Sequence, residues 1–265
     1  MKIVTSASEI DGGCTFVPTM GALHAGHAEL FKLAKSKSDF VVASIFVNPL
    51  QFDDAQDLAN YPRTLDRDIE IAAESGVTHL WLPTQDEIYP SEVKSLSAGE
   101  LGKIYEGANR LGHFDGVVTV VSRLFELLKP KSAIFGEKDF QQLALIREIA
   151  KKVEIIAAPT VREADGLALS SRNVRLDKAH RSAALVIYSA LTAANNSSNV
   201  SEARDVLQRV CAGQPLFKLD YAEIIDEQDF SLATESTLNP RAIIAGWLNG
   251  VRLIDNMQMT IGGQQ

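Results

Sequence analysis

The sequence is poor in cysteine, with only two among its 265 residues, Cys14 and Cys211. Two cysteines this far apart in the chain do not form the framework of a small disulfide-stabilised protein. Each is expected to be a small buried hydrophobic side chain on a strand or a helix. The corresponding expectation for localisation is a reducing, cytoplasmic compartment.

The sequence also lacks long apolar runs and an excess of basic residues. No apolar run approaches the length that spans a membrane, and residues 1–11 do not have the pattern of a secretory signal. The formal net charge of −8 argues against nucleic-acid binding, because a phosphate backbone is bound by a basic face. With 46% hydrophobic and 23% charged residues, the chain is expected to be a soluble globular protein of one large or two modest domains.

Short apolar runs alternate with helical patterns through the first 160 residues. Strands are expected at 14–19, 40–47, 79–82, 133–136 and 153–157. Helices are expected at about 27–37, 64–75, 116–128 and 139–151. This alternation predicts an α/β fold with a parallel sheet and helices on both faces, which binds ligands beyond the carboxyl ends of its strands.

The pattern changes near residue 160. One long amphipathic helix is expected over about 179–194, and a second helix ends at 212. Short strands are then expected at 219–225, 241–248 and 251–255. These patterns predict a first domain over residues 1–160 and a smaller C-terminal α+β domain over residues 161–265.

Residues 18–27 carry the most informative motif, a His-x-Gly-His element between an apolar run and a helical pattern. His24 and His27 are expected at a strand-to-helix turn, where free backbone N–H groups and the helix dipole favour a phosphate. Their spacing lets both imidazoles face one point, and Gly26 lets a ligand approach the backbone. The element alone is also compatible with polar surface histidines or with zinc binding.

A second segment repeats this geometry, because Gly136 ends an expected strand and a helix follows. Lys138 supplies a positive charge for phosphate, and Asp139 can accept hydrogen bonds from ribose hydroxyls. Gln142 lies one turn further along the same face. The alternative is that Lys138 and Asp139 are ordinary surface charges of a first helical turn.

Amide and basic side chains follow in two further segments. Asn48 and Gln51 come after the second expected strand, which Pro49 ends, and amides suit a neutral hydroxyl or a carboxylate. Asn48 could instead only form a turn. Arg110 and His113 precede an apolar helix and could either reach an anion or be solvated loop residues.

A hydroxyl-rich loop near the predicted domain boundary contains Leu169, Ser170, Ser171 and Arg172. Its two hydroxyls, its backbone N–H groups and the planar guanidinium are suited to clamping phosphate. Taken alone, the segment would be a loop with a helix cap. Together with the upstream His-x-Gly-His element, it is typical of the second half of a triphosphate site.

In this order and at these intervals, the motifs resemble the pantothenate synthetase (pantoate–β-alanine ligase) family. The segments that carry the resemblance are 18–27, 46–52, 136–142, 169–172 and 247–256. The resemblance implies a Rossmann-like ATP domain, a small C-terminal lid domain and a homodimer. It implies that ATP and Mg²⁺ support the condensation of pantoate with β-alanine to pantothenate, AMP and pyrophosphate, through a pantoyl adenylate, on the way to coenzyme A.

The resemblance also implies roles for individual residues. The ATP site would be lined by Met20, Gly21, Ala22, Leu23, His24, Ala25, Gly26, His27, Gly136, Glu137, Lys138, Asp139, Val161, Leu169, Ser170, Ser171 and Arg172. His27 would be the proton donor, and His24, Lys138 and Arg172 would be catalytic with it. Gln51 would contact pantoate and β-alanine, and Gln142 would contact pantoate. Which residues would hold the metal is left unassigned.

Three features depart from the family pattern. Leu50 replaces a usual Met, which is a volume-conserving change. Leu111 replaces a usual Pro before Gly112, which loosens that loop. The segment before Cys14 is shorter than is common, which leaves its role at a dimer or sheet edge open.

Three other classes of function compete with this interpretation. A nucleotidyltransferase acting on a phosphorylated acceptor would need a further basic cluster, whereas Gln51 and Gln142 suit an uncharged diol acid better. A tRNA-charging enzyme would need an RNA-reading domain and a less acidic chain. A non-catalytic nucleotide-binding protein would not need the intact set of His24, His27, Lys138 and Arg172.

Overall fold

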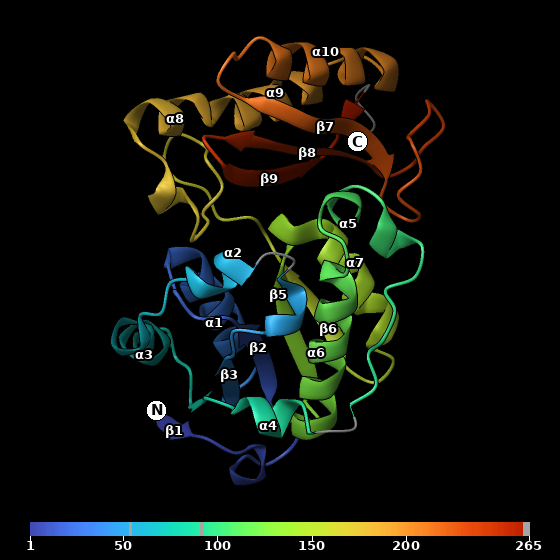
Figure 1. Ribbon diagram of the computed structural model, residues 1–265. Helices are drawn as coiled ribbons and strands as arrows, with labels where there is room; N and C mark the ends of the chain where they lie inside the picture. Colours follow the sequence, from blue (N-terminus) through green and yellow to red (C-terminus); the bar gives the residue numbers. More distant parts are fainter. Residues whose placement is uncertain (53–54, 91–92, 262–265) are drawn as a thin grey trace. The chain divides into compact units, whose positions relative to one another are not determined.

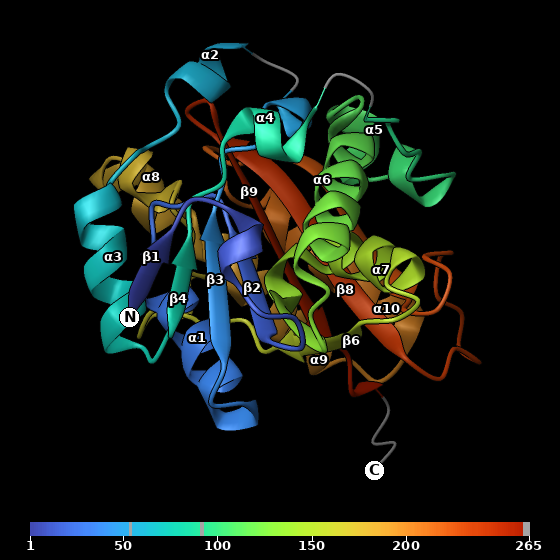
Figure 2. The same ribbon diagram turned by 90° about the horizontal axis from the view of Figure 1, so that it is seen from below.

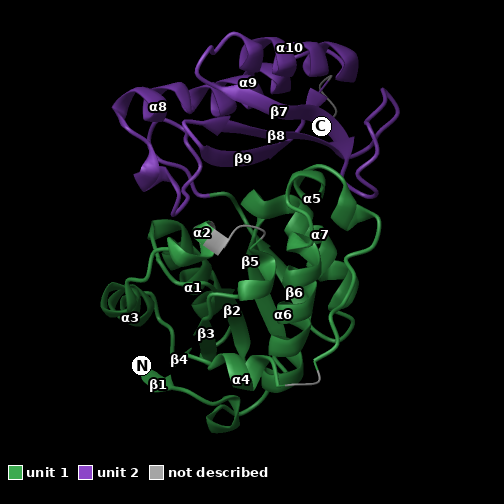
Figure 3. Ribbon diagram, in the orientation of Figure 1, with its two compact units in different colours: residues 1–160 green, residues 161–265 purple. Residues whose placement is uncertain are grey.

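The computed structural model describes residues 1–52, 55–90 and 93–261. The chain divides into two compact units, Met1–Thr160 (unit 1) and Val161–Gln265 (unit 2) (Figure 3). Each unit has its own sheet, so each is described by itself. None of the helices in the described ranges is both long and apolar enough to cross a membrane.

Unit 1 is built on a parallel sheet with the strand order β1-β4-β3-β2-β5-β6 in the described residues (Figures 1 and 2). The strands are β1 (Lys2–Val4), β2 (Thr15–Thr19), β3 (Val41–Ile45), β4 (His79–Trp81), β5 (Ser132–Gly136) and β6 (Glu154–Ala158). The predicted α/β fold class is confirmed. Among the strands of unit 1 in the described residues, β1 is the one that the sequence patterns missed, and it forms an edge of the sheet beside β4. The short N-terminal segment therefore contributes a strand.

The chain leaves β2 toward β3 and β4 on one side and returns to β5 and β6 on the other side. The order of strands thus reverses between β2 and β5, and such a switch point is where open α/β sheets bind ligands. The central strands are buried runs of β-branched and other apolar residues, as expected of parallel strands covered on both faces. Val17, Val41 and Ile134 of these strands pack with Phe31 of the first long helix.

Helices and single 3-10 turns connect the strands of unit 1. They are η1 (Ala7–Glu9), α1 (Ala25–Lys37), η2 (Pro49–Gln51), α2 (Ala55–Ala59), α3 (Leu65–Glu74), α4 (Gln85–Ile88), η3 (Leu101–Lys103), α5 (Glu106–Asn109), α6 (His113–Leu128), η4 (Glu137–Asp139) and α7 (Phe140–Ile149). Helix α1 contacts β2, β3, β5 and α3, whereas α6 packs against α7. Helix α6 begins three residues earlier than expected, because Gly112 adopts a left-handed conformation (φ 77°) that starts it at His113.

Unit 2 contains the antiparallel sheet β7-β8-β9, formed by β7 (Lys218–Asp226), β8 (Pro240–Leu248) and β9 (Val251–Gln258). Its helices are η5 (Asn173–Arg175), α8 (Lys178–Ala183), α9 (Leu185–Asn195) and α10 (Val200–Ala212). The expectation of one helix over 179–194 is wrong. The Ile187 N–H donates to Ala184 O three residues back, and the helix is broken at Ala184.

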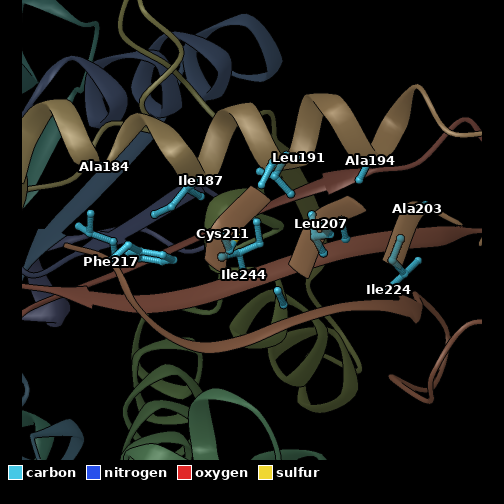
Figure 4. Packing of buried hydrophobic residues seen from close by; sticks show 14 of the residues in the cluster. Ala184, Ile187, Leu191, Ala194, Ala203, Leu207, Cys211, Phe217, Ile224 and Ile244 are labelled. Carbon is cyan, nitrogen blue, oxygen red and sulfur yellow. The ribbon is translucent and has the colours of Figure 1, made fainter. Parts of the chain in front are cut away.

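The apolar faces of α9 and α10 pack on the sheet of unit 2 (Figure 4). Ile187, Leu191 and Leu207 meet Ile244 in this core. Cys211 is buried in the same cluster, and Cys14 is buried in unit 1, as the sequence predicted for both. Burial raises the thiol pKa of Cys14 to about 11 and that of Cys211 to about 12, so neither side chain is a ready nucleophile.

Candidate functional site

Three of the predicted site segments leave the sheet of unit 1 at one edge. Strands β3 and β5 both pair in parallel with β2, so residues after Thr19, Ile45 and Gly136 emerge from the same side. These residues form the segments 20–27, 46–51 and 137–142. The segments lie at or beside the switch point between β2 and β5, which supports one shared site in unit 1.

His24 and His27 form the N-terminal cap of α1. His24 is the N-cap residue, and its Nδ1 accepts the N–H of Gly26 at 3.1 Å. His27 is the third residue of the helix, and its Nδ1 accepts the N–H of His24 at 3.3 Å. Each imidazole therefore accepts a backbone N–H of the first helical turn. The two side chains occupy the positions that a Ser and a Glu have in an ordinary capping box. Their ring centroids lie 4.2 Å apart.

These two hydrogen bonds determine where each imidazole carries its proton. Because each Nδ1 accepts a backbone N–H, a neutral ring must carry its hydrogen on Nε2. Burial and then the neighbouring His24 lower the pKa of His27 to about 3. Burial and then Lys138 lower the pKa of His24. Both residues are thus neutral Nε2–H donors near pH 7, suited to hydrogen-bonding a phosphate oxygen rather than to supplying a full positive charge.

Lys138 and Asp139 lie in η4, directly after β5. Lys138 Nζ is 3.8 Å from Asp139 Oδ2, and the Lys138 side chain is only 20% exposed. The charge of Lys138 lowers the pKa of both histidines, and the charge of Asp139 raises the pKa of His27, which places both charges beside the imidazole pair. Lys138 is therefore not an ordinary solvated charge, and the structure brings it together with His24 and His27.

Gln51 and Asn48 lie in and just before η2, at the end of β3. Asn48 is buried, with 1% of its surface exposed, and it caps η2 by accepting the N–H of Leu50 at 3.2 Å. Its Nδ2 donates to Gln51 Oε1 and to Gly116 O, both at 3.1 Å. Gln51 Nε2 lies 2.8 Å from Met20 Sδ, so Gln51 contacts the segment that leads to the histidines. Asn48 forms a turn and also orients Gln51.

Arg110 and His113 hold the backbone of Gln51 rather than lying in solvent. His113 Nδ1 is 2.7 Å from Gln51 O, and an Arg110 guanidinium nitrogen is 3.4 Å from the same oxygen. Arg110 also lies 3.0 Å from His113 Nε2. A Cβ at Gly116 would be 2.2 Å from Leu50 O, so α6 packs directly against η2. Of the two alternatives left open for Arg110 and His113, the solvated loop does not hold, because α6 begins at His113 and buries it, and Arg110 is half-buried.

Asp68 in α3 is a site residue that the sequence reasoning missed. Its carboxylate accepts the N–H of Ala22 at 3.0 Å and that of Leu23 at 2.8 Å, and it is almost fully buried. These bonds hold the loop before His24, where Gly21 (φ 82°) and Ala22 (φ 50°) are left-handed. A signal was available, because Asp68 falls within the apolar stripe of α3 that includes Ala72.

The remaining predicted site residues lie in unit 2, apart from Gln142. Leu169 N–H donates to Val161 O at 2.9 Å, and Ser170 Oγ accepts the N–H of Arg172 at 3.2 Å. The loop from 169 to 172 is thus an ordered turn before η5. Its approach to the residues of unit 1 stays a prediction. Gln142 lies in α7 of unit 1, two residues after the start of the helix.

The neutral imidazole of His27 predicts a pH dependence of stability. The folded chain binds this proton only near pH 3, whereas an unfolded histidine binds it near pH 6.5. Between these values the unfolded state binds more protons, so the free energy of unfolding falls as the pH is lowered. We expect wild type to lose stability relative to His27→Asn from about pH 6.5 downward, measured by urea unfolding. If the difference in the free energy of unfolding between wild type and His27→Asn stayed constant from about pH 7.5 to about pH 4, the neutral state of His27 would be contradicted.

Comparison with known proteins gives one family. The family model described as Pantoate-beta-alanine ligase matches residues 2–258. The pantothenate synthetase of Acidothermus cellulolyticus is 46% identical over 271 residues, covering 97% of this chain and 89% of the relative. That of Thermus thermophilus is 42% identical and covers 98% of this chain and 99% of the relative.

Two solved structures that superpose on this chain carry the same family names as these relatives. Pantothenate synthetase from Thermus thermophilus superposes with a TM-score of 0.91 at 42% identity, covering 97% of this chain and 99% of that chain. Pantoate-beta-alanine ligase from Francisella tularensis, complexed with beta-gamma ATP and beta-alanine, superposes with a TM-score of 0.80 at 36% identity. Coverage is 97% of both chains in that comparison.

Proposed function

This chain belongs to the pantoate–β-alanine ligase family, and we propose that its condensation of pantoate with β-alanine passes through a pantoyl adenylate formed at the His24–His27 turn. ATP is the activating substrate. The supporting observation is the reciprocal imidazole cap beside Lys138, which places two N–H donors and a cation at a helix N-terminus. That arrangement suits a triphosphate whose α-phosphorus is attacked by a carboxylate.

The chemistry requires a carboxylate to become a better acyl donor. The pantoate carboxylate oxygen attacks the α-phosphorus of ATP, the bond to the β-phosphate oxygen breaks, and pyrophosphate leaves. Negative charge grows on the α-phosphoryl and departing oxygens, where His24, His27 and Lys138 stabilise it by hydrogen bonds and charge. The amine of β-alanine then attacks the acyl carbon, and AMP leaves.

The family's proton-donor role for His27 is retained here as donation of a hydrogen bond, without transfer of the proton. A neutral imidazole with its hydrogen on Nε2 donates a hydrogen bond to the developing oxyanion without becoming charged first. Full transfer of that proton would leave an imidazolate, which is costly in a buried site. We therefore assign His27 as a hydrogen-bond donor to the transition state and retain the proton-donor role only in that form.

The remaining nucleotide contacts are proposed by matching position. Met20 to Ala25 with Gly26 and the segment Gly136 to Asp139 would bind the nucleotide in unit 1. Val161 would touch the adenine, and the loop from Leu169 to Arg172 would close on the phosphates, which is the lid role proposed for unit 2 from the family resemblance. Arg172 would contribute a planar, permanently charged donor to the triphosphate.

Mg²⁺ is proposed to enter as part of the MgATP substrate. In the described ranges no three His, Cys, Asp or Glu side chains form a metal-binding group. Mg²⁺ is commonly held by substrate phosphates and waters with few protein carboxylates. The side chains of the described ranges therefore fit a metal that the nucleotide carries. We also propose a homodimer in the cytoplasm, on the strength of family membership alone.

The proposed reaction is tested by its products. Purified protein with ATP, Mg²⁺, pantoate and β-alanine is expected to release AMP and pantothenate in equal amounts. A control without pantoate is expected to release neither product. Transfer of AMP to another acceptor without amide formation would favour a nucleotidyltransferase, and absence of turnover would favour a nucleotide-binding protein.

The acid pocket gives a further prediction. Gln51→Ala and Gln142→Ala are each expected to weaken pantoate binding by roughly 1–3 kcal/mol, because a buried polar group would be left unpaired. The KM for pantoate should rise while the KM for ATP changes little. If ATP affinity collapses instead, these amides belong to the nucleotide site and the pocket assignment is wrong.

A further inference from the structure

Tyr89 is the C-cap residue directly after α4, and its hydroxyl is linked to Gln51 through the side chain of Asn48. Its hydroxyl lies 2.6 Å from Asn48 Oδ1, and Asn48 Nδ2 lies 3.1 Å from Gln51 Oε1. Phe46, at the end of β3, packs beside the Tyr89 ring with a centroid distance of 6.0 Å. Tyr89 has no place among the predicted site residues, and neither the proposed reaction nor the helix itself requires its hydroxyl.

Two backbone groups settle which end of the Asn48 amide is oxygen. The Leu50 N–H can only donate, so the atom it meets must be Oδ1. The Gly116 carbonyl can only accept, so the atom it meets must be Nδ2. The Tyr89 hydroxyl must therefore donate its hydrogen to Oδ1. Burial raises the pKa of Tyr89, so the hydroxyl keeps that hydrogen.

The direction of this chain determines what Gln51 offers to a ligand. Asn48 Nδ2 donates to Gln51, so Gln51 must turn its oxygen toward Asn48 and its Nε2 amide hydrogens away, toward Met20. The backbone of Gln51 is held separately by His113. With the backbone of Gln51 fixed, its side-chain amide could still rotate, and the buried hydrogen bonds from Tyr89 through Asn48 prevent that rotation.

We infer that Tyr89 is a positioning residue that, through Asn48, fixes the Gln51 amide with its N–H groups toward the acid substrate. A hydroxyl or carboxylate oxygen of pantoate is the partner that accepts from such N–H groups. This inference rests on the proposed function, because it takes Gln51 as the pantoate contact. Tyr89 itself touches no substrate.

Tyr89→Phe is the direct test, because it removes only the hydroxyl and keeps the ring that packs on Phe46. We expect the KM for pantoate to rise about two- to tenfold, as for the loss of one hydrogen bond. The KM for ATP should stay unchanged. Tyr221→Phe in β7 of unit 2 is the matched control, and its pantoate KM should equal that of wild type.

A double variant separates positioning from general destabilisation. If Tyr89 acts through Gln51, Tyr89→Phe adds nothing to the pantoate KM of Gln51→Ala, and the two effects are non-additive. Additive effects, an equal rise in both substrate KM values, or a pantoate KM unchanged in Tyr89→Phe would overturn the inference. If Gln51→Ala itself leaves the pantoate KM unchanged, the assignment of Gln51 in the proposed function fails instead.

Asn48→Asp provides a second variant with a different signature. The carboxylate keeps the acceptor for Leu50 N–H and Tyr89 but removes both N–H donors, so Gln51 is expected to turn its own N–H groups toward residue 48. Gln51 Oε1 would then face the substrate. We expect a larger rise in pantoate KM than for Tyr89→Phe, and an equal or smaller rise would contradict the proposed direction of the chain.

Discussion

His24→Ala and His27→Ala are each expected to lower kcat by about 10²-fold or more, with smaller effects on KM. The reason is geometric. Each ring accepts a backbone N–H on Nδ1, so its Nε2–H is free to donate to the charge that develops on the α-phosphoryl oxygens. Steady-state kinetics with saturating ATP would measure the loss. Near-wild-type kcat in either variant would remove that residue from the mechanism.

Alanine also removes the helix cap, so a matched variant is needed. His24→Asn and His27→Asn place an amide oxygen near the position of Nδ1. Asparagine is a strong N-cap residue at position 24, and at the third helical position its oxygen keeps an acceptor for the His24 N–H. We expect these variants to recover most of the free energy of unfolding lost in the alanine variants. The loss of a cap typically costs about 1 kcal/mol. They should remain as inactive as alanine, because the Nε2 donor is still missing. Recovery of activity with stability would mean that the histidines act only as caps.

The sequence predicted the parts of this molecule that are periodic or local. The alternation of apolar runs and helical patterns predicted the central strands of unit 1, and the His-x-Gly-His spacing predicted a strand-to-helix turn. The three-residue strand β1 was missed because only Val4 of its residues is buried, so the segment lacks the apolar run that marked the equally short β4. The break at Ala184 was missed because the amphipathic pattern continues across it.

The polar network of the site could not be predicted in the same way. Asn48 bonds to Gly116, which is 68 positions away, and to Tyr89, which is 41 positions away. Asp68 holds a loop 46 positions upstream. Such bonds depend on which chain segments the fold brings together, and pattern in one segment does not contain that information. The neutral state of the histidines likewise follows from burial and from Lys138.

The order of the two chemical steps is tested by isotope exchange. If the acid is activated first, protein with ATP, Mg²⁺ and pantoate alone forms a bound acyl adenylate and pyrophosphate. Labelled pyrophosphate is then expected to enter ATP without β-alanine, because the first step is reversible while the adenylate stays bound. Omitting pantoate should abolish exchange, since no carboxylate attacks the α-phosphorus. Exchange that strictly requires β-alanine would exclude the two-step order.

Lys138→Ala is expected to reduce this exchange rate by about tenfold or more, because it removes a fixed charge aimed at the phosphates. Lys32→Ala is the matched control, since Lys32 is an exposed lysine of α1 paired with Glu29, and its exchange rate should equal that of wild type. Lys138 acts on the first step, so the exchange rate should fall at least as much as the overall rate of pantothenate formation. If exchange is preserved while amide formation is lost, Lys138 serves the attack of the amine, and its charge belongs to the second step.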